Sequence, residues 1–383
     1  MIKTCKILIL LIISFFTVNT NIYCEEAEIM NSQIESLNIQ RFLEYSKKYS
    51  KNLGEDFDIN NFFSEALTGK IDNSTLLKRL LNILGKELRS NINVIGIILV
   101  IIVVHSILRN FSENLEDKGV SQITYYVEYI LIITIILSSF SQMIGVVKDT
   151  IQNLVGFLQS LLPILITLML STGSFVSAGV IQPILLFLIT FIGNLVINFI
   201  LPLVLIGTTF SIISKLSNEV KIDKIAKLFK STSIWILGIV LTLFVTVLSL
   251  EGGLTSSVDG VTAKTTKAAV STVVPVVGKI LGDAVDAVIG CSGILKNAVG
   301  IVGVLIIIAI CISPIIKLAI LTITYYLASS IAEPISDSNI VGLLEQIGDT
   351  FKIMLAILFS VSLMLIIGIT IVIRISNSAL MYR

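Results

Sequence analysis

Apolar residues run in long blocks along most of this chain, and charged residues gather in the short segments between the blocks. A helix needs about 20 apolar residues to cross a bilayer. No residue from Thr150 to Ser214 is charged, so this run of 65 residues alone holds more than one pass. The pattern predicts an all-α polytopic membrane protein with apolar spans at residues 92–108, 123–147, 153–172, 176–197, 199–213, 232–250, 298–324 and 352–373.

The first 24 residues have the order of a secretory signal peptide, with Lys3 and Lys6 before an apolar core from Ile7 to Val18. The residues before Cys24 lack the small side chains of a cleavage site, so cleavage and a retained anchor both stay open. In either case the lysines stay inside and the following segment, 25–90, is exported. Leucines at three- and four-residue spacing predict that it ends in an amphipathic helix, after a shorter helical part.

Lysines set the expected topology of the membrane regions, 91–250 and 301–383. Segment 215–231 carries five lysines against two acids and has an apolar face, so we expect a cytoplasmic amphipathic helix there. The segment 251–300 and the C-terminus then fall outside.

Prolines supply a second pattern. Pro163, Pro202, Pro275 and Pro314 each open an apolar run, and proline interrupts helix hydrogen bonding, so broken helices are expected near them. Pro163 and Pro202 are 39 residues apart, as are Pro275 and Pro314. Transporters often contain repeats with interrupted helices at matching positions, so the spacing points either to a duplication or to coincidence in an apolar sequence.

Segment 251–300 fits neither a transmembrane helix nor an ordinary loop. It holds eight Gly, ten Val and six Ala but no aromatic residue, and four Lys balance four acids. We expect such residues to pack closely, to line a cavity or to contact a partner. Pro275 makes a re-entrant element a further interpretation. The candidate partner or passage residues are Pro275, Gly278, Gly282, Asp283, Asp286 and Lys296 here, and Lys317 in the following span.

Each candidate also has a plainer interpretation. Gly278 and Gly282 permit close helix packing, inside the chain or between copies. Asp283 and Asp286 share a helical face, which indicates a solvated or partner-facing stripe more than acid–base chemistry. Lys317 lies within an apolar run, where it faces a cavity, pairs with an acid or reaches the membrane interface.

Composition narrows the functional classes. The chain is 55% hydrophobic and 14% charged with a net charge of +1, so no basic field attracts nucleic acid. His105 is the one histidine, and no metal-ligand spacing or catalytic constellation is present, so we expect no metal, no cofactor and no enzyme. Glu128, beside three tyrosines, is expected at a membrane interface. The cysteines outside the signal segment, Cys291 and Cys311, are expected to act as small apolar residues, and a disulfide is an alternative only for Cys291, because Cys311 lies in a span.

The stretches EGGLTSSVDGV, TAKTTKAA and TVVPVVGKILGDAVDAVIGCSGILKNAVG, within 251–300, resemble the most characteristic part of the stage III sporulation protein AE family. The wider layout agrees, with a signal-like start, an exported helical region and a polytopic body. The resemblance implies a multi-pass protein of the mother-cell membrane around the forespore. It also implies a transenvelope channel or feeding complex, built with other stage III membrane proteins and a forespore partner.

Two other functional classes remain open at this point. A stand-alone secondary transporter fits the prolines and the possible repeat, whereas a non-conducting membrane scaffold needs neither. The lipid bilayer is the one certain partner, and a homo-oligomer is possible.

Overall fold

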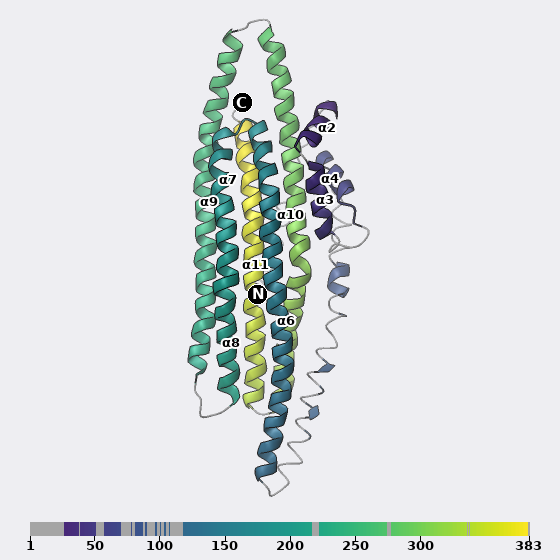
Figure 1. Ribbon diagram of the computed structural model, residues 1–383, viewed down its shortest axis with the longest axis vertical. Helices are drawn as coiled ribbons and strands as arrows, with labels where there is room; N and C mark the ends of the chain where they lie inside the picture. The colour runs from purple at the N-terminus through teal and green to yellow at the C-terminus, as the bar shows by residue number, and fades with distance from the viewer. Residues whose placement is uncertain are drawn as a thin grey trace.

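The computed structural model describes residues 27–37, 39–50, 57–69, 118–216, 222–273, 277–334, 336 and 338–381, with scattered residues between 78 and 107. These residues form an all-α, polytopic membrane protein. Five of the described helices are long and apolar enough to cross a membrane. They stand side by side in an elongated bundle (Figure 1). The signal segment, His105 and Pro275 lie outside the described residues.

The long helices exceed the thickness of a bilayer. They are α6 (Lys118–Ser171), α7 (Phe175–Leu195) continued by η2 (Val196–Ile200) and α8 (Leu201–Leu216), α9 (Asp223–Val273), α10 (Val277–Ala332) and α11 (Ser338–Met381). At about 1.5 Å per residue, the 56 residues of α10 extend about 84 Å, against about 30 Å of hydrocarbon.

Two pairs of predicted spans are therefore wrong as separate crossings. Residues 123–147 and 153–172 belong to α6, and 176–197 and 199–213 belong to the continuous run α7–η2–α8. The polar residues between each pair stay inside a helix, because a helix needs only its own backbone hydrogen bonds to continue. Joining both pairs removes two crossings, so the Lys-rich segment and residues 251–300 still lie at opposite ends of the bundle (Figure 1).

The prediction of helices broken at prolines is also wrong for three of its four prolines, the fourth being Pro275, which lies outside the described residues. Pro163 lies inside α6 and Pro314 inside α10. Pro202 is the second residue of α8, which directly follows the π-helical turn η2. A proline cannot donate to the carbonyl four residues earlier, and a wider turn just before it absorbs the mismatch without ending the helix.

The 39-residue spacing does not mark a structural repeat. Pro163 and Pro202 lie on antiparallel helices separated by the turn at Thr172–Ser174, where Gly173 adopts a left-handed φ of 81°. Residues 277–314, by contrast, belong to one unbroken helix.

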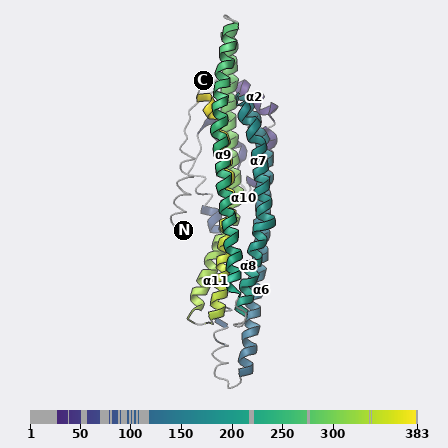
Figure 2. The same cartoon turned by 90° about the vertical axis from the view of Figure 1, so that its left-hand side faces the viewer.

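The described residues of segment 251–300 form the two arms of an antiparallel helical hairpin, and the choice between an exported and a re-entrant segment stays a prediction. Helix α9 continues to Val273 and α10 begins at Val277. The two helix ends project past the ends of α7 and α11 in both side views (Figures 1 and 2). Val273 lies 14 positions after Asp259, which corresponds to about 21 Å of projection.

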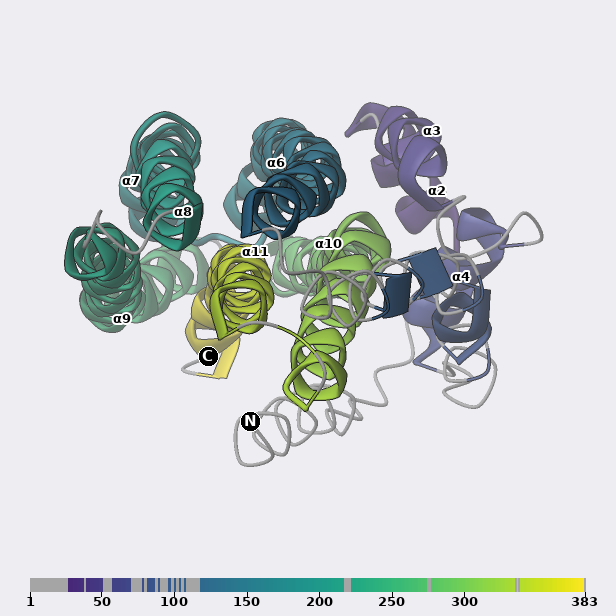
Figure 3. The same ribbon diagram turned by 90° about the horizontal axis from the view of Figure 1, so that it is seen from below.

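The long helices form two rows when the bundle is seen along its axis (Figure 3). One row holds α6 with α7 and α8, and the other holds α9, α11 and α10. Helix α11 packs on both α10 and α9, and its buried residues Phe351, Met354, Leu358 and Val361 form the centre of the core.

The N-terminal region is helical, as predicted, and packs on the side of the bundle. It contains α2 (Ala27–Ser36), α3 (Ile39–Ser50) and α4 (Ile59–Thr68). Asp58 caps α4 by accepting from the Asn60 N–H at 2.9 Å, and Gly69 ends it at a φ of 69°. The rings of Phe42 and Tyr49 pack on Phe157 of α6, and Gln33 donates to Ser292 of α10 at 3.0 Å.

Candidate functional site

The predicted site residues do not form one compact site. Gly278, Gly282, Asp283 and Asp286 lie in the first turns of α10, and Lys296 and Lys317 follow further along the same helix. Lys317 lies 39 positions after Gly278, which corresponds to about 58 Å of helix, so no single ligand contacts both ends. These residues instead mark α10 from the projecting tip to the middle of the bundle.

Two lysines on α10 have different surroundings. Lys296 is fully buried, whereas Lys317, three residues after Pro314, is only partly buried. A buried ammonium needs polar contacts to offset the loss of water. Both lysines have such contacts, which indicates that they are built into the bundle.

Glycines further along α10 serve internal packing. A Cβ at Gly303 meets Leu161 Cδ2 of α6 at 2.6 Å, and one at Gly300 meets the side chain of Ile373 on α11. Close approach of three helices therefore depends on these two glycines. The sequence left open whether small residues here pack inside the chain or between copies, and for Gly300 and Gly303 the structure gives internal packing.

An acid of segment 251–300 holds the hairpin to the bundle. Asp259 is fully buried, and its Oδ1 and Oδ2 accept from the backbone N–H groups of Val176 and Ser177 at 2.9 and 3.0 Å. These are free N–H groups in the first turn of α7, whose N-cap residue Ser174 makes no side-chain cap. A carboxylate is stabilised there by the helix dipole, so Asp259 caps α7 from another helix. Sequence reasoning missed it, because no local pattern reveals a cap supplied from 82 residues away.

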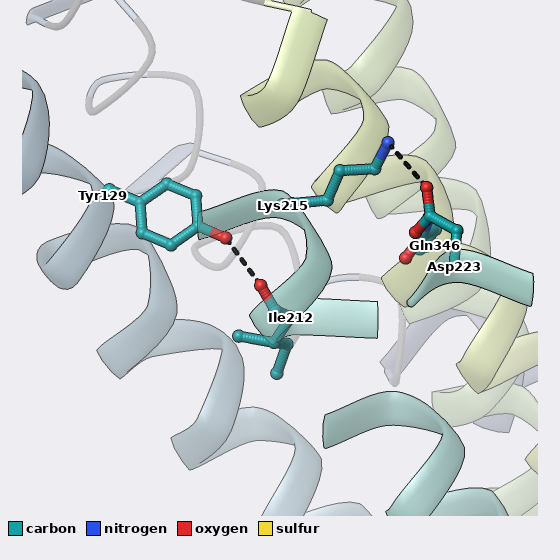
Figure 4. Close-up of polar contacts among 5 residues, drawn as sticks. All are labelled: Tyr129, Ile212, Lys215, Asp223 and Gln346. Carbon is teal, nitrogen blue, oxygen red and sulfur yellow. Dashed lines mark hydrogen bonds and ion pairs between the residues drawn. The ribbon is translucent and has the colours of Figure 1, made fainter. Parts of the chain in front are cut away.

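At the opposite end, four residues form what we call the α8–α9 polar cluster. Lys215 Nζ lies 3.5 Å from Asp223 Oδ2, and Gln346 Nε2 donates to Asp223 Oδ1 at 3.2 Å (Figure 4). Lys230, which is 8% exposed, donates to the Gln346 carbonyl at 3.0 Å. The cluster therefore joins α8, α9 and α11.

Two glycines leave space for the side chains of the lysines in this cluster. The stem of Lys230 packs against Gly207, and that of Lys215 packs against Gly342. Nearby, Tyr129 donates to the Ile212 carbonyl at 2.9 Å (Figure 4). Two of the lysines that the sequence assigned to a cytoplasmic surface helix are thus structural contacts of the bundle.

The arrangement favours packing and contact over chemistry. Within the described residues, no group of three or more His, Cys, Asp or Glu side chains is placed to hold a metal ion. Cys311 is a buried free thiol that accepts from the Ser362 hydroxyl at 2.9 Å. Cys291 is disulfide-bonded, so the expectation of a small apolar role was wrong for this residue and the alternative that the sequence left open holds.

Comparison with known proteins gives a family. A profile described as Stage III sporulation protein AE matches residues 57–376. The Stage III sporulation protein AE of Bacillus subtilis (strain 168) is 32% identical over 307 residues, which cover 80% of this chain and 77% of that protein. No solved structure matches the chain. The matched region includes the hairpin, Asp259, the α8–α9 polar cluster and every candidate residue.

Proposed function

The chain belongs to the stage III sporulation protein AE family, and from this premise we propose that it is a membrane component of a transenvelope channel or feeding complex. The complex joins mother cell and forespore and is needed for late forespore development. The protein lies in the mother-cell membrane around the forespore. Its partners are other stage III membrane proteins and a forespore membrane protein across the intermembrane space.

The observation that carries this proposal is the projecting hairpin. The ends of α9 and α10 extend about 21 Å beyond the first turn of α7, and they lie at the bundle end opposite the Lys-rich segment. The positive-inside rule assigns that Lys-rich end to the cytoplasm. The hairpin then points into the intermembrane space, where a partner anchored in the second membrane reaches it.

The hairpin arms are suited to protein contact more than to lipid. They contain Lys264, Lys267, Lys279, Asp283 and Asp286 together with many small residues. Charged residues are expensive in hydrocarbon, so arms of this composition fit an aqueous space. The scarcity of large side chains permits a partner helix to approach closely.

The transporter alternative has lost the features that favoured it. The described prolines do not break their helices, and the 39-residue spacing is not a structural repeat. A non-conducting scaffold remains distinguishable by experiment. Cysteines placed along 287–303 and probed with a water-soluble thiol reagent give periodic labelling deep in the membrane for a lined passage, and no labelling there for a scaffold.

The proposal is tested by shortening the hairpin. Residues 262–285 are replaced by a short Gly-Ser turn, which keeps Asp259 and the α2 contact at Val288. We expect normal abundance in the membrane and a block in sporulation after engulfment, in an endospore-forming host with no other copy. The double variant Asp283→Asn/Asp286→Asn tests the side chains at full hairpin length. Normal spore yield with the shortened hairpin contradicts the proposal.

A further inference from the structure

Helix α6 exposes a polar face within Tyr129–Ser171, although the overall composition of this segment is apolar enough to cross a membrane. Its exposed residues recur at three- and four-residue spacing, so they form one stripe along the helix. We call this the α6 polar stripe. Its exposed members are Ser138, Ser141, Gln142, Lys148, Asp149, Gln152, Asn153, Gln159 and Ser160.

No large apolar side chain interrupts the stripe. Leu137 and Leu170 are exposed on α6, and between them the helix exposes none. The stripe lies inside the candidate membrane span Tyr129–Ser171. Helix α6 itself belongs to the row that it forms with α7 and α8 (Figure 3). Polar and charged groups facing lipid are costly, so in a membrane such a stripe is covered by protein or water.

Among the described residues, no side chain packs closely against the glycines of the stripe. A Cβ added at Gly145 or Gly156 has no atom within 4 Å, in contrast to the packed Gly300 and Gly303. Ser141 with Gly145, and Gly156 with Ser160, are each four residues apart. Small residues at this spacing let a second helix pack closely in a membrane.

The charges indicate which helix that is. Lys148 and Asp149 are exposed neighbours of opposite sign, and no described residue forms an ion pair with either. Successive residues on a helix are about 100° apart, so the two flank the midline of the stripe on which Gly145, Gln152 and Gly156 lie. A stripe with a lysine on one flank, an aspartate on the other and glycines between them is complementary to itself.

We propose that the α6 polar stripe packs on the same stripe of a second copy of this chain, related by a two-fold axis along the membrane normal. Copies inserted by the same pathway share one orientation, so the two α6 helices run parallel and equal residues meet at equal height. Rotation by the two-fold axis places Lys148 of each copy beside Asp149 of the other. This contact removes the polar face from lipid and forms two Lys148–Asp149 ion pairs between the copies, one on each side of the axis. The proposal concerns assembly and stands apart from the channel role.

Cysteine cross-linking of the full chain in native membranes tests the contact. Gln152→Cys lies on the midline of the stripe, and Leu243→Cys lies on the outward face of α9, where the leucine is 57% exposed. Under mild oxidation we expect a disulfide-linked dimer for Gln152→Cys and none for Leu243→Cys. The parent chain corrects for native thiols. A dimer that forms equally with both variants, or with neither, overturns the proposal.

Charge reversal tests the register in the Gln152→Cys background. Lys148→Asp alone and Asp149→Lys alone place like charges together, so each lowers the dimer yield by about tenfold or more, since such a juxtaposition costs several kcal/mol. The double variant Lys148→Asp/Asp149→Lys restores it, because the exchanged charges pair again across the axis. Failure of the double variant to recover, or cross-links to another protein alone, overturns the assignment of the stripe to a second copy. Water-soluble thiol labelling without any cross-link overturns it as well.

Discussion

Helices α6 and α9 both expose a broad face on the same bundle, and the two faces differ in chemistry. The outward face of α9 presents large apolar side chains, with Trp235 71% and Leu243 57% exposed. The α6 polar stripe presents amides, hydroxyls and an opposite charge pair at Lys148 and Asp149. Lipid is a favourable environment for the apolar face of α9, but it offers no partners to the polar groups of the α6 polar stripe. Exposure in a membrane protein can therefore suit two different neighbours, which are lipid on α9 and, under the proposed dimer contact, protein on α6.

The largest expected effect comes from adding a charge to each face. Leu243→Lys puts an ammonium against lipid, which costs about 2.5–3.5 kcal/mol on insertion scales. We expect a clear fall in the amount of membrane-inserted protein. Gln152→Lys, on the α6 polar stripe, is expected to insert nearly as well as the parent, because that face already carries charge. Protease protection measures the amount of inserted chain. Equal losses of inserted protein for the two variants contradict the difference between the faces of α6 and α9.

A second contrast uses two aspartates in opposite settings. Asp259→Ala leaves the first turn of α7 without its buried cap, and a hydrogen bond to a charged group contributes about 1.5–3 kcal/mol. Thermal unfolding in detergent should show a lower midpoint for this variant. Asp149→Ala removes an exposed carboxylate, so unfolding stays unchanged while dimer cross-linking falls. A stable Asp259→Ala protein contradicts the role of that residue as a cap.

Glycines give a third matched pair. Gly303→Leu forces a side chain into Leu161 of α6, and overpacking of this kind costs about 1–3 kcal/mol. Gly156→Leu meets open space, so the monomer unfolds like the parent. The added leucine does separate two α6 helices, so Gly156→Leu is expected to reduce cross-linking. Thermal unfolding measured with cross-linking separates the two effects.

The smallest effect is expected for a substitution on the outward face of α9. Trp235→Ala removes a large side chain that faces outward, and exposed substitutions of this kind usually stay within about 0.5 kcal/mol. Thermal midpoint, cross-linking of Gln152→Cys and spore yield should all match the parent. A loss of association in this variant indicates that α9 also contacts protein.

The sequence predicted the class of structure and the separation of its two ends. Apolar blocks identified helices that cross a membrane, and the lysines before α9 marked the end opposite the hairpin. Leucine spacing after residue 76 agrees with the helical residues 81–86. These predictions held because hydrophobicity and periodicity are local properties.

The number of crossings was wrong for a physical reason. Dividing the chain into apolar blocks of about 20 residues treats Lys148 and Asp149 as the end of a span, although α6 continues through them. Helix continuity depends on backbone hydrogen bonds, which neither polar side chains nor Pro163 abolish. The spacing of Ser138, Ser141, Gly145, Lys148 and Gln152 was visible in the sequence, and it was the available signal for the stripe.

The sequence predicted the candidate residues on α10 only from their residue types and spacing, without the contacts that each one makes. Glycine and lysine spacing cannot distinguish an internal contact from an external one. Gly300 packs on Ile373, whereas no described side chain packs closely on Gly156, and only the three-dimensional arrangement separates these cases. The Asp259 cap and the Gln346–Asp223 contact join residues 82 or more positions apart, which no local pattern encodes.

Helix α10 is unbroken from Val277 at the projecting tip to Ala332 at the other end of the bundle. A rigid rod of this kind transmits tilt and displacement along its whole length. A partner that pulls or leans on the tip therefore moves Lys296 and the part of α10 within the bundle by the same rotation. The hairpin is in this sense a lever, because a force applied at its tip becomes a displacement of the helices within the bundle.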